Sequence, residues 1–300
     1  MGVGLGGIAR ETFPDGEIGI QILEEVRGKD AFIVQSLSRR PNRHFMELLI
    51  MVDALKRASA RSVIAVLPYY AYARQDRRDK GRVPITARLV ADLLEKAGVS
   101  RVLTMDLHTE QIQGFFNIPV DNLVARPILV RAIQERKVQR AVVVSPDVGS
   151  NKMARKFAED LGVSLAIVDK RRVDAHRVDA NALIGDVEGM DVVLVDDMCS
   201  TGSTLKLAAK VCRAHGARSV RAAVTHGLLL GGGFQDAGIE EIIATDTIAP
   251  MGFAQSTVSV APLFAQAISC VVAARSVSSL YAPKKLNMMD GYEKVDSFKA

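Results

Sequence analysis

The chain alternates short apolar runs with stretches of helical periodicity, and this alternation constrains its fold more than any other feature. Helices are predicted over residues 43–58, 84–97 and 204–215. Seven runs rich in Val, Ile and Leu are predicted as buried strands: residues 31–35, 63–67, 102–105, 141–145, 165–168, 192–195 and 220–224. Strands that alternate with helices in this way form parallel sheets covered by helices, so we expect an α/β fold.

The helix predicted over residues 84–97 has the clearest boundaries. Pro84 suits the first position of a helix, and Gly98 suits the position that follows the last turn. Four apolar residues are predicted to form the stripe that faces the core: Ile85, Leu89, Leu93 and Leu94.

The rhythm of strands and helices pauses near residues 121–127 and then repeats, which indicates two tandem domains. We place the first domain at residues 1–122 and the second at residues 123–274, a division that suits a chain of 300 residues. Residues 275–300 are expected to pack back on the first domain, although the polar tail 282–300 is expected to be poorly ordered.

Composition excludes several functional classes. Aromatic residues make up 5% of the chain and Trp is absent, whereas a nucleic-acid platform needs aromatic rings that stack on bases. The net charge of +5 favours anionic ligands without requiring a nucleic acid. Three widely spaced cysteines form neither a disulfide framework nor a thiolate zinc motif, and they fit a reducing cytosol.

The uncharged stretch 247–274 raises the question of a membrane span. It contains Pro250, Gly252 and Pro262 and several polar residues, whereas a spanning helix needs about 20 mostly apolar residues. The first residues also lack the pattern of a signal peptide. We therefore expect a cytoplasmic protein with no membrane partner.

The most informative motif is VVLVDDMCSTGST at residues 192–204. Asp196 and Asp197 follow an apolar strand, and a loop of small residues leads into a helix. In open parallel sheets ligands bind at the carboxyl ends of strands, and the amides of a helix N-terminus bind phosphate. Paired carboxylates accept hydrogen bonds from vicinal hydroxyls, so the motif predicts a site for a phosphorylated pentose. The alternative is an ordinary capped turn, but two adjacent acids that close an apolar strand are costly there.

Basic residues gather between residues 74 and 88 and again at Lys170, Arg171 and Arg172, which follow the strand predicted at 165–168. Cations positioned around a phosphoryl group stabilise its charge, and a basic loop that closes over a nucleotide excludes water. From the residues alone, the segment 74–88 is more readily interpreted as solvated surface, whereas the position of Lys170, Arg171 and Arg172 at the carboxyl end of a strand favours a function.

His108 and Asp147 each follow a predicted strand closely. Mg²⁺ prefers oxygen ligands and keeps several waters, and a lone histidine is more often structural than ligating. Residues 13–17, FPDGE, predict a tight turn around Gly16, and most such turns only join two strands.

Together these segments resemble the ribose-phosphate pyrophosphokinase family. The motif DDxxxTGxT at 196–204 resembles the phosphoribosyl-binding loop of phosphoribosyltransferase-like proteins. The other matching segments are FPDGE at 13–17, YARQDRR at 72–78, DLHTEQIQGFF at 106–116, SPDVG at 145–149 and DKRR at 169–172. The resemblance runs from about residue 13 to residue 281. It implies two tandem phosphoribosyltransferase-like domains, each a mostly parallel sheet flanked by helices.

The resemblance also implies an activity, an ATP:ribose 5-phosphate diphosphotransferase that makes phosphoribosyl diphosphate and AMP for nucleotide biosynthesis, with Mg²⁺ as cofactor. The implied catalytic residues are Lys170 and Arg172, and the implied metal ligands are His108 and Asp147. The implied ATP-binding residues are Phe13, Asp15, Glu17, Arg74, Gln75 and His108. The implied ribose 5-phosphate-binding residues are Arg172, Asp196, Asp197, Ser200, Thr201, Gly202, Ser203 and Thr204. A dimer-based homo-oligomer, with a hexamer as one form, is implied because residues 13–17 reach the ATP site of a neighbouring subunit.

The chain departs from the family pattern at several positions. Twelve residues precede Phe13 where the family has a strand and a helix, so we expect either that the start codon is placed too late or that the first strand–helix unit is missing, which would expose apolar surface. Ser200 stands in place of a third acid, Ser203 in place of a small Gly or Ala, and Ser150 in place of a glycine. Residues 228–233 also differ, which leaves regulation by ADP and phosphate open. Two alternatives follow: a catalytically silent regulatory subunit of the same fold, and an ordinary phosphoribosyltransferase.

Overall fold

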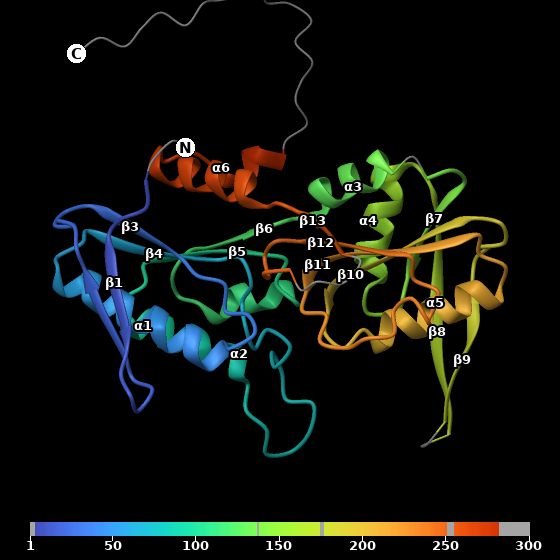
Figure 1. The fold of residues 1–300 in the computed structure, drawn as a ribbon, viewed down its shortest axis with the longest axis horizontal. Coiled ribbons are helices and arrows are strands. Elements are labelled where there is room, and N and C mark those ends of the chain that lie inside the picture. The colour runs from blue at the N-terminus through green and yellow to red at the C-terminus, as the bar shows by residue number, and fades with distance from the viewer. Residues whose placement is uncertain (1–3, 137, 175–176, 251–254, 282–300) are drawn as a thin grey trace, which may run out of the picture.

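The computed structural model describes residues 4–136, 138–174, 177–250 and 255–281 of the chain. Over these residues the strands form two larger sheets and a separate hairpin, and helices cover both faces of the sheets (Figure 1). The predicted α/β fold is confirmed, and each of the seven predicted strands is present, in most cases extended by one or more residues.

The first sheet has four parallel strands in the described residues, in the order β3-β4-β5-β6. Its strands are β3 (Asp30–Val34), β4 (Ser62–Leu67), β5 (Arg101–Met105) and β6 (Val120–Leu123). Helices α1 (Pro41–Arg57) and α2 (Thr86–Ala97) cover one face, and the short helix η1 (Glu110–Phe115) links β5 to β6. Central strands such as β4 are buried on both faces, which explains their continuous apolar sequence.

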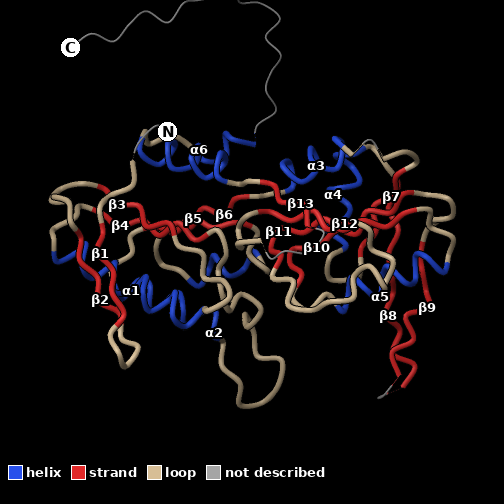
Figure 2. The backbone as a smooth tube through the Cα atoms, viewed as in Figure 1, coloured by secondary structure: helices blue, strands red, loops and turns tan. Residues whose placement is uncertain are grey.

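The second sheet has seven strands in the described residues, in the order β13-β12-β11-β10-β7-β8-β9. The strands are β7 (Ala141–Ser145), β8 (Ser164–Asp174), β9 (Arg177–Ile184), β10 (Asp191–Cys199), β11 (Ser219–Gly227), β12 (Glu241–Thr245) and β13 (Gln255–Val258). All neighbours are parallel except β8 and β9. Helices α3 (Arg126–Glu135) and α4 (Asn151–Leu161) cover one face, and α5 (Ser203–Ala214) covers the other (Figure 2).

The end of the described chain returns to the first sheet. Helix α6 (Ala261–Val272) lies over that sheet (Figure 2), and its Phe264 and Ala267 share an apolar cluster with Ile64 and Leu103. The short helix η2 (Val277–Tyr281) follows, and the Val124 amide donates a hydrogen bond of 2.8 Å to the hydroxyl of Tyr281. The described part of 275–300 therefore packs toward the first sheet, residues 282–300 lie outside the described residues, and the domain boundary at 122 stays a prediction.

The stretch 247–274 does not form a long apolar helix. It contains β13 and the 12-residue helix α6, separated by residues 259 and 260. Across the described residues, no helix has both the length and the apolar character needed to cross a membrane.

The stripe predicted for α2 is wrong. Leu94 is buried, but Leu89 and Leu93 are exposed, as is Ile85. The buried face is instead made of Ala87, Val90, Ala91 and Leu94, which follow the spacing i, i+3, i+4 and i+7. The helix also begins at Thr86 rather than at Pro84. Gly98 does end it in the left-handed conformation, with φ of 111°.

A hairpin of β1 (Ile8–Thr12) and β2 (Ile18–Ile22) stands at one end of the molecule (Figure 1). It is fastened to α1, because Arg10 donates to the buried carboxylate of Glu47 at 2.6 Å and Arg43 donates to Thr12 at 2.8 Å. Strand β3 nearby is at a sheet edge; among the described residues it pairs with β4 alone, and Val34 is 61% exposed. Apolar surface is therefore exposed at this end of the molecule.

Candidate active site

The loop after β10 encloses a cavity at the carboxyl ends of the strands. Strand β10 continues past Val195 to Cys199 because it stays paired with β11, and the loop then leads through Gly202 into α5. The cavity has a volume of about 140 Å³ and is lined by Arg74, Asp196 and residues 198–205. Thr201 and Ser203 are exposed to it from the loop side. The structure thus brings the predicted ribose-phosphate residues of this loop together.

The geometry of the loop suits a phosphate group. The first hydrogen bond of α5 runs from the Lys206 amide to the Gly202 carbonyl, so the loop supplies the backbone amides of the helix N-terminus. Such amides bind anions, and the helix dipole adds to the attraction. Gly202 has φ of 75°, and a Cβ there would overlap the ring of Phe234, so the position requires glycine.

A second loop, residues 228–233, supports the first one. The amide of Leu229 donates to the carbonyl of Cys199 at 3.0 Å, and the amide of Leu230 donates to the carbonyl of Ser200 at 2.9 Å. Gly231 comes so close to the Thr201 carbonyl that a Cβ would overlap its oxygen. The sequence marked this segment as a departure from the family pattern, but it gave no sign that the segment shapes the phosphate loop.

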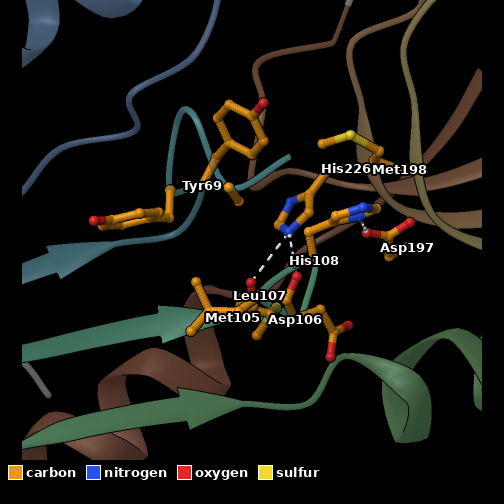
Figure 3. A pocket seen from close by; sticks show the side chains of 10 residues that line it. Tyr69, Met105, Asp106, Leu107, His108, Asp197, Met198 and His226 are labelled. Carbon is orange, nitrogen blue, oxygen red and sulfur yellow. Dashed lines mark hydrogen bonds and ion pairs between the residues drawn. The ribbon is translucent and has the colours of Figure 1, made fainter. Parts of the chain in front are cut away.

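Residues from both sheets meet in a second, smaller cavity beside this one, and Met198 lines both cavities. The Nδ1 atom of His108, which follows β5, lies 2.6 Å from Oδ2 of Asp197, on β10 (Figure 3). This hydrogen bond raises the pKa of His108. Burial is the largest influence on the pKa of Asp197 and would raise it, but the hydrogen bond from His108, the charge of that ring and the contact with Asp196 together hold the pKa below its ordinary value. The pair is therefore a hydrogen-bonded contact across the junction of the two sheets.

Asp196 has a different electrostatic environment from its neighbour. Burial, reinforced by the charge of Asp197, raises the pKa of Asp196 to about 7. Its Oδ1 accepts hydrogen bonds from the Ser150 hydroxyl at 2.7 Å and from the Asp197 amide at 3.0 Å. Ser150 also lies against Asp147, with its amide 3.1 Å from Oδ1 of that residue. Two acids predicted for different ligands, Asp147 and Asp196, are thus joined through one serine.

The predicted ATP residues lie in two separate places. Arg74 lines the phosphate cavity, and the neighbouring Gln75 is exposed and accepts a hydrogen bond of 2.5 Å from Thr86 at the start of α2. Residues 13–17 form the turn of the hairpin β1–β2, where Gly16 has φ of 97° and Phe13 is 43% exposed. Figure 1 shows this hairpin at the far end of the first sheet, away from β10.

The described side chains can hold Mg²⁺ only if substrate phosphates and water supply the remaining ligands. No group of three or more His, Cys, Asp or Glu side chains that could hold a metal exists among the residues that the structure describes. Asp147 offers the oxygen ligands that Mg²⁺ prefers, whereas the Nδ1 atom of His108 is engaged by Asp197. Mg²⁺ is commonly held by one or two carboxylates together with substrate phosphates and water, and Asp147 suits that arrangement.

Comparison with known proteins finds matches over most of the chain. The N-terminal domain of ribose phosphate pyrophosphokinase matches residues 1–98, and the phosphoribosyl transferase domain matches residues 121–248. The ribose-phosphate pyrophosphokinase of Wolinella succinogenes is 48% identical over 94% of this chain and 93% of its own. The chain belongs to the ribose-phosphate pyrophosphokinase family.

Other relatives agree with this placement. A ribose-phosphate pyrophosphokinase of Caldanaerobacter subterraneus is 50% identical over 90% of this chain and 88% of its own. The crystal structure of phosphoribosylpyrophosphate synthetase from Mycobacterium smegmatis superposes with a TM-score of 0.84 at 42% identity, covering 91% of this chain and 92% of that one. The predicted family and its tandem α/β architecture are confirmed.

The remaining residues expected for a ribose-phosphate pyrophosphokinase lie on β8. Lys170 and Arg172 were expected in a loop after Val168, but β8 continues to Asp174, with Arg172 opposite Val178 of β9. The two strands stay paired in an antiparallel register that runs from Ile167 opposite Ile184 to Asp174 opposite Arg177. The side chains of Lys170 and Arg172 lie outside the described part of the structure, so their catalytic roles stay predictions.

Sequence reasoning missed three residues that contact this site: Ser150, Thr225 and His226. Ser150 stood out only as a serine in place of a glycine beside Asp147. Thr225 and His226 lie at the carboxyl end of β11, and that position is the signal that would have drawn attention to them.

Proposed function

We propose that the chain transfers the diphosphoryl group of ATP to ribose 5-phosphate, giving phosphoribosyl diphosphate and AMP. The oxygen of the anomeric hydroxyl forms a bond to the β-phosphorus, the bond from that phosphorus to the α,β-bridging oxygen breaks, and a proton is released to solvent. The observation that carries the proposal is the phosphate cavity, which has Asp196 at its wall; Asp197, the next residue of β10, forms the hydrogen bond to His108.

Different residues of the cavity are proposed to bind the phosphate and the ribose of the sugar phosphate. The backbone amides at the start of α5, with the hydroxyls of Thr201, Ser203 and Thr204, receive the 5-phosphate. Asp196 accepts hydrogen bonds from the ribose hydroxyls, assisted by Asp197. Ser200, which replaces an acid, leaves one negative charge fewer beside the phosphate.

Transfer of a diphosphoryl group requires positioning and neutralisation of charge more than covalent chemistry. Arg74 lies at the cavity wall, where its guanidinium can face the phosphates of ATP. Lys170 and Arg172 are proposed to approach from the β8–β9 hairpin and to stabilise the charge that develops during transfer. Mg²⁺ held by Asp147, with His108 nearby, supplies further neutralisation of the phosphates when it is bound.

The ATP site is proposed to be shared between subunits of a dimer-based homo-oligomer. The hairpin turn that carries Phe13, Asp15 and Glu17 is exposed and stands away from β10 of its own chain (Figure 1). Its attachment to α1 through Arg10 and Glu47 fixes the direction in which it projects. An aromatic ring and two acids on a fixed exposed turn can complete an adenine site in a second copy of this chain.

The experiment that tests the activity measures AMP release from ATP and ribose 5-phosphate in the presence of Mg²⁺. Turnover that requires both substrates and stops on addition of a chelator is expected. Absence of turnover from folded protein would favour the silent regulatory subunit instead. Product formed from phosphoribosyl diphosphate and a nucleobase without ATP would favour an ordinary phosphoribosyltransferase.

A further inference from the structure

The direction of the His108 side chain depends on the turn that precedes it. Asp106 directly follows β5 and has φ of 38°, in the left-handed region that residues with side chains rarely adopt. His108 follows two residues later, and its ring reaches Asp197 of the other sheet. A turn held in an unfavourable conformation needs surrounding contacts that fix it, and such turns are common at functional sites.

Contacts from the second sheet fix this turn. The hydroxyl of Thr225 donates to Oδ2 of Asp106 at 2.6 Å. The Nε2 atom of His226 lies 3.1 Å from the carbonyl oxygen of Met105 and 3.2 Å from that of Asp106 (Figure 3). Carbonyl oxygens only accept hydrogen bonds, so Nε2 carries the hydrogen and donates to both.

Contacts with Thr247 and Tyr69 hold the His226 side chain in place. Its Nδ1 atom lies 2.9 Å from the Thr247 hydroxyl, and the Tyr69 ring packs edge-on against its imidazole at a centroid distance of 5.1 Å. Burial lowers the pKa of His226, which agrees with a neutral ring that donates from Nε2. Thr225 and His226 are 1% and 3% exposed, and His226 borders a cavity of only about 10 Å³ beside His108. Neither residue can therefore touch a substrate, and any effect on catalysis passes through their neighbours.

We infer that Thr225 and His226 are positioning residues, which hold the Asp106 turn and thereby aim His108 at Asp197. The inference rests on the proposed function, because it takes the His108–Asp197 pair to be part of the active site. Loss of either contact is expected to leave the fold intact while His108 samples other directions. A displacement of about 1 Å in an active-site group can cost about a hundredfold in rate.

The chain offers a matched pair of substitutions for the test. Thr225→Val removes the hydroxyl that binds Asp106, and Thr104→Val removes a buried hydroxyl on β5 that has no hydrogen-bond partner among the described residues. Both changes preserve side-chain shape. We expect Thr225→Val to lower kcat for AMP release by about tenfold or more, and Thr104→Val to change it by less than about twofold. Thr225→Ser, which keeps the hydroxyl, should restore most of kcat.

A double-mutant cycle separates a positioning role from a merely structural one. If Thr225 acts through His108, Thr225→Val should cause little further loss of kcat in a His108→Ala background. His226→Gln, which keeps a donor near the position of Nε2, should retain more activity than His226→Leu, at similar melting temperature. Additive losses of kcat for Thr225→Val and His108→Ala would overturn this inference but leave the proposed function standing. Equal kcat for Thr225→Val and Thr104→Val would do the same. Full activity of His108→Ala would overturn the proposed role of His108 and this inference with it.

Discussion

Gly231 offers a direct test of whether the loop 228–233 shapes the phosphate site. A Cβ at this position would overlap the carbonyl oxygen of Thr201, which is a backbone atom of the phosphate loop. Such an atom cannot rotate away as the end of a flexible side chain can. Gly231→Ala must therefore push the phosphate loop out of place.

The size of the effect follows from the overlap. Non-bonded heavy atoms rest about 3.5 Å apart, so relief of this overlap requires a shift of about 1 Å. A misplacement of about 1 Å can cost about a hundredfold in rate, which corresponds to about 2.7 kcal/mol of transition-state stabilisation. We expect kcat/KM for ribose 5-phosphate to fall by about a hundredfold, with a smaller change in KM for ATP, because the displaced amides bind the sugar phosphate.

The adjacent glycine is the control. A Cβ on Gly232 would meet no atom within 4 Å, so Gly232→Ala should behave like the unsubstituted chain. The assay measures AMP release while one substrate is varied and the other is saturating, and melting temperatures show that both variants are folded. The same kcat/KM for ribose 5-phosphate in the two variants would refute the proposed link between the loops.

Three further predictions address other parts of the molecule. Lys170→Ala should lower kcat by orders of magnitude without altering the circular dichroism spectrum, and a kcat near that of the unsubstituted chain would exclude its catalytic role. Asp196→Asn should raise KM for ribose 5-phosphate much more than KM for ATP; equal effects would count against a ribose contact. Asp191 has its pKa lowered to about 2, chiefly by the hydrogen bond from Arg218. Because this pKa lies below the unfolded value, Asp191→Asn should cost about 2 kcal/mol of unfolding free energy at pH 7. That cost should vanish as the pH falls from 4 to 2, whereas a cost that persists at pH 2 would contradict the ion-pair explanation. Asp53→Asn is the control, because it breaks an exposed i,i+4 ion pair with Arg57. It should cost less than about 0.5 kcal/mol of unfolding free energy.

The sequence predicted the structure best where the local pattern of apolar residues reflects burial. Strands such as β4 and β7 are apolar throughout because both faces are covered, so their positions were predictable to within one or two residues. The loop after Asp196 was predictable because its acids, small residues and following helix are contiguous. Phosphate binding needs all three features at one strand end.

Errors arose where small residues or distant contacts decide the structure. The buried face of α2 is made largely of Ala87, Val90 and Ala91, and the larger leucines drew attention to the opposite side. Two partners of Asp106, Thr225 and His226, lie more than one hundred positions away. No periodicity or motif reports such a contact, because it depends on how the two sheets are placed against each other.

The junction between the sheets has a consequence for the way in which the chain can be divided. His108 belongs to the first sheet and Asp197 to the second, so a fragment carrying either sheet alone would hold half of the pair. A single polypeptide keeps both halves at a high effective concentration, which two separate gene products would reach only by binding each other tightly. Covalent continuity through residues 121–127 therefore keeps His108 and Asp197 together without a separate binding step.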